Sequence, residues 1–146
     1  MLDMIRFMMK RIKVDQFAIL GEHVPTGEIG LTINSDFKSS VEGKAVGVGM
    51  SFDFVDKQIS ERFMVMRLFC EFEIIEEDWN NCIKDSMVTI PREALEFFAL
   101  HTVGTARGIM FCKTESTAFN GVIIPPINVR ELVNGDLNIP LTKEQK

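Results

Sequence analysis

Apolar and polar residues alternate almost without error over residues 44–55. One side of this segment is apolar at every second position, at Val46, Val48, Met50, Phe52 and Phe54. The opposite side carries small or polar residues, among them Gly47 and Gly49. Successive side chains of a β-strand point to opposite faces of a sheet, so this pattern predicts a strand with one buried face.

A second alternating segment follows at residues 63–76. Its apolar side consists of Met64, Met66, Leu68, Cys70, Phe72 and Ile74. Its other side mixes charged residues with apolar ones, as at Arg67 and Phe69. The link between the two strands, residues 56–62, is short and mainly polar. Neighbouring strands with such a link are expected to pair as an antiparallel hairpin.

Two weaker strands precede this hairpin. Residues 29–37 alternate small or polar residues with apolar ones, namely Ile29, Leu31, Ile33 and Phe37. Residues 14–20 form a less regular apolar run, and residues 21–27 form a turn region between the two. We predict that the four strands pair in chain order as an antiparallel meander, with one face in the core and the other at least partly in water.

The apolar spacing becomes helical after residue 85 and predicts a helix over residues 91–112. Pro91 suits the first turn, and Glu93 lies near the positive end of the helix dipole. The apolar stripe is broader than one narrow face and includes Leu95, Phe97, Phe98, Leu100, Val103, Ala106, Ile109 and Met110. Such a helix must pack against other parts of the protein on two sides, so its apolar stripe needs a second cover besides the sheet. A second subunit is the favoured source of the second cover, ahead of a loop.

The last third of the chain is less regular. Residues 114–127 are expected to be extended and end in a Pro pair, and a short helix follows over residues 128–133, where Asn128 can cap the first turn. The sequence therefore predicts an α+β fold: a four-stranded antiparallel sheet, a long helix, an extended Pro-containing connector and a short second helix. We expect one domain over residues 1–146, with flexible ends at 1–11 and 141–146.

Composition supports an ordered chain and narrows its partners. The 146 residues are 46% hydrophobic and 25% charged, with 12 Phe, 9 Met and no Tyr. The net charge of -5 argues against nucleic acid, because phosphate backbones are bound by clustered Lys and Arg. No stretch approaches the roughly 20 apolar residues of a membrane-spanning helix. We therefore expect a soluble, cytoplasmic protein without membrane insertion.

Metal and cofactor chemistry has little support in the sequence. The three cysteines are widely spaced, and only two histidines, His23 and His101, accompany them. Structural zinc sites need four ligands at short local spacings. Free buried thiols are therefore the favoured interpretation of the cysteines, and no cofactor is expected.

Catalytic motifs are equally scarce. The glycines of residues 43–49 lie inside a strand, so they cannot form a phosphate-binding turn between a strand and a helix. Glu71 and Glu73 share one strand face and could act as an acid–base pair if buried. Together with residues 76–78 they are better interpreted as a solvated face, or as an acidic surface for a basic partner. A small enzyme or ligand-binding domain that uses Glu71, Glu73 or His101 as polar anchors is kept as an alternative.

Several strings resemble the SecB export-chaperone family in their order and spacing over about residues 28–134. They are Glu28-Ile-Gly-Leu-Thr-Ile33, Phe69-Cys-Glu-Phe72 with Ile74-Ile75, the helix bearing Pro91, Arg107-Gly108, and Pro125-Pro126-Ile127-Asn128. The resemblance implies an ATP-independent holdase that binds unfolded polypeptides in hydrophobic grooves. It also implies a homo-oligomer, either a dimer or a tetramer built as a dimer of dimers.

The resemblance also implies where partners bind. Clients, either preproteins or a dedicated antitoxin, are expected where the long helix, the extended connector and the sheet edge meet. The expected client-binding residues are Phe98, Ile109, Phe119, Ile123, Ile124 and Ile127. A SecA-type motor is expected to dock on the exposed sheet face, at Phe69, Glu71 and Glu73.

Three features depart from the family pattern. The first crossover loop is reduced to residues 21–27, the second helix does not continue after Leu132, and Arg67 places a charge beside the expected docking position. Groove depth and client identity therefore stay open. A third interpretation, a structural oligomer that kept the fold alone, also stays open.

Overall fold

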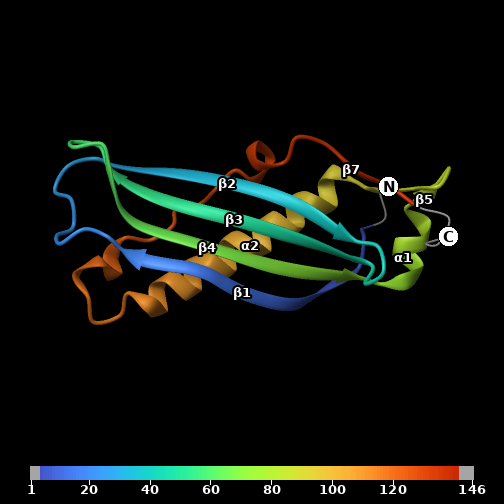
Figure 1. The fold of residues 1–146 in the computed structure, drawn as a ribbon, viewed down its shortest axis with the longest axis horizontal. Coiled ribbons are helices and arrows are strands. Elements are labelled where there is room, and N and C mark those ends of the chain that lie inside the picture. The colour runs from blue at the N-terminus through green and yellow to red at the C-terminus, as the bar shows by residue number, and fades with distance from the viewer. Residues whose placement is uncertain (1–3, 142–146) are drawn as a thin grey trace.

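A long four-stranded antiparallel sheet lies against a single long helix in the computed structural model, which describes residues 4–141 (Figure 1). The strands are β1 (Phe7–Ile19), β2 (Ile29–Ser40), β3 (Ala45–Asp56) and β4 (Glu61–Ile74). The helix, α2 (Arg92–Lys113), crosses behind the sheet at an angle to the strands. The predicted α+β class, with its four antiparallel strands and long helix, is confirmed.

The strand order differs from the predicted meander. It is β1-β4-β3-β2, so β1 pairs with β4 at the far side of the sheet from β2. The link at residues 20–28 can reach about 30 Å when extended, whereas three strand spacings measure about 14 Å. It passes the end of β4, where the amides of Leu20 and Gly21 donate to the Phe63 carbonyl at 2.8 and 3.2 Å. The meander prediction was wrong because a short link was taken to mean neighbouring strands.

The inner face of the sheet is the predicted apolar face. The alternating apolar residues of β3 and β4 are almost completely buried under α2. Phe72 and Phe98 stack with ring centroids 4.8 Å apart, and Phe7 of β1 meets both rings edge-on. These rings join the two layers, since they come from the sheet and from the helix.

β1 is much longer than predicted. Its inward-facing residues, Phe7, Met9, Ile12, Val14, Phe17 and Ile19, follow the inward residues of β4 in register. Two β-bulges, between Met9 and Arg11 and between Val14 and Gln16, each insert one extra residue. Residues 7–11, predicted as part of a flexible end, are therefore strand. Residues 1–3 and 142–146 of the predicted flexible ends lie outside the described part.

A small second sheet and a short helix, none of them predicted, fill one end of the molecule. Helix α1 (Glu76–Asn81) buries Trp79. β5 (Ile83–Lys84), β6 (Met87–Ile90) and β7 (Leu137–Pro140) form an antiparallel sheet in the order β5-β6-β7. β7, which follows the connector in the sequence, therefore pairs with β6, which precedes α2.

The predicted long helix and connector are present with small changes. Pro91 occupies the position before the first residue of α2, and Lys113 lies in its last turn. Two 3-10 helices follow α2: η1 (Ala118–Gly121) lies within the connector, and η2 (Val129–Leu132) lies directly after it. Asn128 caps η2 as predicted, because its side chain accepts a hydrogen bond from the Arg130 amide at 3.2 Å. The predicted second helix is thus a single 3-10 turn.

Candidate functional site

An open apolar groove lies between the β2 edge of the sheet and the connector. Its volume is about 470 Å³. Apolar side chains dominate its lining, including Val24, Ile29, Leu31, Val122, Ile123 and Pro125. β2 is the last strand of the sheet on this side, so one row of its main-chain groups is not paired with another strand of the described chain.

Hydrogen bonds to the connector hold the wall of the groove in place. The Arg107 guanidinium of α2 donates to the carbonyls of Ile124 and Pro125, at 2.6 and 2.9 Å. Further along, the Ser35 hydroxyl of β2 donates to the Leu132 carbonyl at 3.0 Å. The two prolines also fix the backbone near Ile123. The wall is therefore fixed to both the helix and the sheet.

The six predicted client-binding residues divide into three groups by exposure. Phe98 and Ile124 are fully buried and Phe119 is 5% exposed, so none of the three is accessible to a client in this conformation, and Phe98 packs on Phe7 and Phe72 rather than at the groove. Ile123 is 51% exposed and lines the groove. The side chains of Ile109 and Ile127 are half-buried and pack against the core. The structure therefore brings one of the six residues to the groove surface.

The residues on the β2 side of the groove were not among the predicted client-binding residues. Ile29 and Leu31 point to the inner face of an edge strand, where cover is incomplete, and Val24 comes from the link at residues 20–28. Their alternation was visible, but it predicted only a buried strand face. The strand order was needed to reveal that β2 is an edge.

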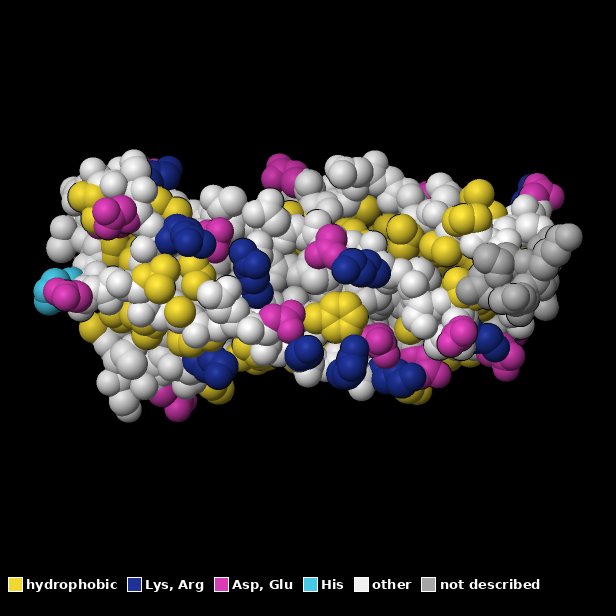
Figure 2. All heavy atoms as spheres, viewed as in Figure 1, with side chains coloured by type: hydrophobic (Ala, Val, Ile, Leu, Met, Phe, Trp, Pro, Cys, Tyr) yellow, Lys and Arg dark blue, Asp and Glu magenta, His cyan; other side chains and the backbone are white. Residues whose placement is uncertain are grey.

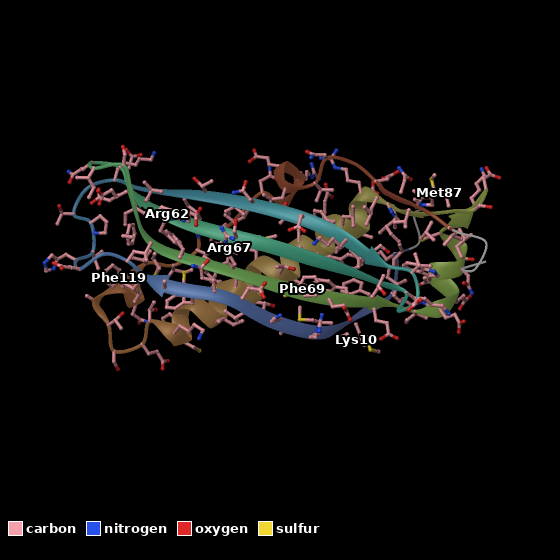
Figure 3. All side chains as sticks on the ribbon, in the orientation of Figure 1. Lys10, Arg62, Arg67, Phe69, Met87 and Phe119 are labelled. Atoms are coloured by element: carbon pink, nitrogen blue, oxygen red, sulfur yellow. The ribbon has the colours of Figure 1, made fainter. Side chains whose placement is uncertain are left out.

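The outer face of the sheet carries the three predicted docking residues, which alternate with the buried residues of β4; Figure 3 labels Phe69. The Phe69 ring lies over Gly47, where an added Cβ would collide with it, and the Arg11 guanidinium lies 5.5 Å from the ring centroid. Glu71 lies 3.8 Å from Arg11, and Glu73 lies 3.5 Å from Lys10. β1 thus supplies a cation to each of the two carboxylates that were predicted to meet a basic partner.

The polar anchors of the alternative enzyme hypothesis do not converge. His101 contacts the rings of Phe7 and Phe72 on the helix side of the sheet, at 5.5 and 6.3 Å between centroids. Glu71 and Glu73 lie on the opposite side of the sheet. These three residues therefore share no site in which an acid and a base could act together.

The acidic run at residues 76–78 has a structural role in the first turn of α1. Arg6 donates to Asp78 at 2.8 to 3.0 Å and to Glu77 at 3.1 Å. Hydrogen bonds from Arg6 lower the pKa of Asp78, and a hydrogen bond and the charge of Lys44 lower the pKa of Glu76. The run ties the start of β1 and the β2–β3 turn to α1.

The cysteines differ in exposure. Only Cys70 is buried, and burial raises the pKa of its thiol, although a hydrogen bond with Thr102 opposes this effect. Cys82 is half-buried and Cys112 is exposed, so the prediction of buried thiols was right only for Cys70. Within residues 4–141, no three His, Cys, Asp or Glu side chains are placed to hold a metal ion. No helix in this range is both long enough and apolar enough to cross a membrane.

Comparison with known proteins identifies the fold. No protein-family model and no curated protein sequence matches the chain. A SecB-like chaperone from Mycobacterium tuberculosis, solved with a ChAD peptide from the HigA1 antitoxin, superposes with a TM-score of 0.53 at 11% identity, over 84% of this chain and 91% of that one. A protein of unknown function from Streptococcus agalactiae gives a TM-score of 0.40 at 11% identity, over 86% and 100%. The resemblance predicted from the sequence is confirmed at the level of the fold, in a divergent form.

Proposed function

We propose that this protein is an ATP-independent holdase that binds unfolded polypeptide segments in the groove beside β2. The open apolar groove of about 470 Å³ is the observation that carries this proposal. A folded chain buries most of its large apolar side chains, so an exposed apolar groove is typical of a surface that receives a partner. The antitoxin peptide bound by the structurally similar chaperone supports a polypeptide client.

The client in this proposal is an extended chain. The unpaired edge of β2 offers main-chain donors and acceptors, and the groove beside it receives every second side chain of an added strand. Ile123 and Leu31 on opposite walls give the apolar contacts. Preproteins and a dedicated antitoxin both fit this chemistry, in a cytoplasmic setting. Docking of a SecA-type motor at the outer face stays a prediction.

Aggregation of a denatured test protein measures this activity. We expect the protein at equal molar ratio, without nucleotide, to suppress the light scattering of the diluted test protein. Ile123→Ser and Leu31→Ser each remove an apolar contact and should raise the concentration needed for half suppression by about tenfold. Ile83→Ser changes a comparably exposed isoleucine far from the groove and serves as the control.

Two outcomes would count against the proposal. If the wild-type protein leaves aggregation untouched, it has no general holdase activity. If the groove variants suppress aggregation as well as Ile83→Ser does, clients bind elsewhere. Thermal unfolding of each variant separates lost binding from lost folding.

A second candidate function, a structural homo-oligomer, is favoured by the outer side of α2. Phe97, Leu100 and Phe111 are large apolar side chains that remain exposed on this helix. They match the predicted need for a second cover, which a dimer or a tetramer built as a dimer of dimers would supply. Solution mass measures this directly: Leu100→Glu should lower the mass of the assembly. A monomeric wild-type protein would eliminate the candidate.

A further inference from the structure

The outer face of the sheet exposes its cations more than its carboxylates. Four ion pairs occur there or on the adjoining strand β1: Lys10–Glu73, Arg11–Glu71, Lys13–Asp15 and Arg62–Asp53. In each of these four pairs the cation is the more exposed partner, as for Arg11 (59%) over Glu71 (22%), whereas in the Lys57–Glu28 pair at the end of β2 the carboxylate is more exposed. Figure 2 shows Lys and Arg side chains spread over this face. An approaching partner therefore meets guanidinium and ammonium groups first.

Arg67 is the cation at the middle of this face (Figure 3). Like Lys38 of β2 on the same face, and unlike Lys10, Arg11, Lys13 and Arg62, it forms no ion pair with any other residue within residues 4–141. It lines a shallow depression of about 330 Å³ together with Asn34 and Ser51, and two carboxylates, Asp15 and Asp36, stand at the same depression. An incoming carboxylate can pair with Arg67 without displacing an existing partner.

Phe69 lies two residues along β4 from Arg67, on the same face, so the two side chains are about 7 Å apart along the strand. An extended peptide repeats its side chains on one face with the same spacing. When a carboxylate of such a peptide pairs with Arg67, the next side chain on the same face of the peptide lies over the half-buried Phe69 ring. Arg11, on the other side of the ring, can meet a second carboxylate.

We propose that the outer sheet face, centred on Arg67, Phe69 and Arg11, docks an acidic extended segment of a partner protein. Carboxylates of the segment pair with Arg67 and Arg11, and an apolar or aromatic side chain between them packs on Phe69. A basic partner, the sequence-based interpretation of Glu71 and Glu73, fits this face poorly, because both carboxylates already have cationic partners.

Nucleic acid also fits less well than an acidic peptide. Binding to a phosphate backbone needs a continuous track of cations, whereas here Asp15, Asp36 and Asp53 interrupt the cations. The net charge of -5 opposes a long polyanion as well. A short peptide can place a few carboxylates at the cations and leave the acidic positions untouched.

Fluorescence anisotropy with three labelled probes tests the proposal on the full chain. The probes are a short peptide that alternates Glu and Ser around a central Phe, the same peptide with Lys in place of Glu, and a single-stranded oligothymidine. We expect the Glu peptide to bind most tightly, and to bind more weakly as salt rises. Tighter binding of the Lys peptide or of oligothymidine would overturn the proposal, as would binding of no probe.

Matched variants locate the binding surface. Arg67→Gln should weaken binding of the Glu peptide about tenfold, the effect of one lost charge-assisted contact. Lys84→Gln removes one positive charge on β5 and should have no effect beyond about twofold. Equal effects of these two variants would overturn the proposal. The groove variant Leu31→Ser should leave Glu-peptide binding unchanged, so failure of this site and failure of the holdase groove are distinguishable.

Discussion

Phe69 and Phe72 lie three positions apart in β4 but on opposite faces of the sheet. Phe72 is fully buried between the rings of Phe7 and Phe98. Phe69 is half-buried and lies between Gly47 and the Arg11 guanidinium. One strand therefore presents the same side chain to an apolar core and to a charged surface.

The difference separates stability from recognition. Around Phe72 the inner face is closed by α2, so its aromatic side chains have no access to a partner there in this conformation, and the cover opens toward β2, at the groove. The outer face of β3 and β4 carries ion pairs, and no helix of residues 4–141 lies over it (Figure 1). Substitutions beneath α2 should change folding first, and substitutions on the outer face should change binding first.

The largest expected effect comes from replacing Phe72 and Phe69 by Ala in two separate variants. Phe72→Ala should lower the free energy of unfolding by about 3–5 kcal/mol, because it leaves a cavity among packed rings. Phe69→Ala should lower it by no more than about 1.5 kcal/mol, since the ring is only partly removed from water. Urea unfolding of both variants measures the contrast. Equal losses would mean that Phe69 is a core residue and would break the comparison.

Two glycine substitutions sharpen the comparison at intermediate effect. Gly47→Ala should lower the free energy of unfolding by about 1 kcal/mol, because the new Cβ displaces the Phe69 ring from its contact with Arg11. Gly104→Ala on the exposed side of α2 should raise it by about 0.5–1 kcal/mol, since no atom obstructs the new Cβ and Ala favours a helix. Thermal unfolding of both variants shows whether each substitution lowers or raises the stability of the fold. A stabilising Gly47→Ala would show that the ring does not rest on Gly47.

The smallest expected effect concerns the pH dependence of stability. It arises from the contacts that tie the start of β1, the strand that contributes to both faces, to α1. The pKa values of Asp78 and Glu76 are lowered in the folded protein, below their usual 3.8 and 4.5. A lowered pKa stabilises the fold above the usual value, and this contribution is lost as the pH falls through the lowered value. Asp78→Asn should therefore weaken the protein slightly at neutral pH and flatten the decline of stability in acid.

Urea midpoints measured from pH 7 to pH 3 would reveal this behaviour. Glu22→Gln, at an exposed carboxylate of the link at residues 20–28, should leave the wild-type profile unchanged. An Asp78→Asn profile parallel to that of the wild type would mean that the contacts with Arg6 do not stabilise the fold.

The sequence predicted those parts of the fold in which the apolar period is unbroken. β3, β4 and α2 were predicted closely, because their side chains keep periods of two and of three to four. β1 was predicted only in part, because two bulges change the spacing of its inward residues at Met9 and Val14. β7 was missed, since a strand of four residues that pairs with a distant strand leaves little local signal.

The candidate site was less predictable than the fold. Ile123 was identified from the resemblance, whereas Leu31 and Val24 depend on the strand order β1-β4-β3-β2, which no local pattern encodes. Likewise, the sequence predicted Glu71 as part of a solvated or partner-binding acidic face, and only the pairing of β1 with β4 revealed Arg11 beside it. The groove and the outer sheet face are therefore both formed by contacts between residues far apart in the chain.

The position of β1 beside β4 also has a consequence for synthesis. The ribosome releases Phe7–Ile19 long before Glu61–Ile74, so the first strand of the nascent chain waits for its only partner in the sheet. β2, β3 and β4 can meanwhile form successive hairpins as they emerge. A strand that waits unpaired is open to pairing with other chains, and bulges and exposed lysines are features that discourage it. The bulges and lysines of β1 are therefore expected to discourage such pairing until β4 has been synthesised.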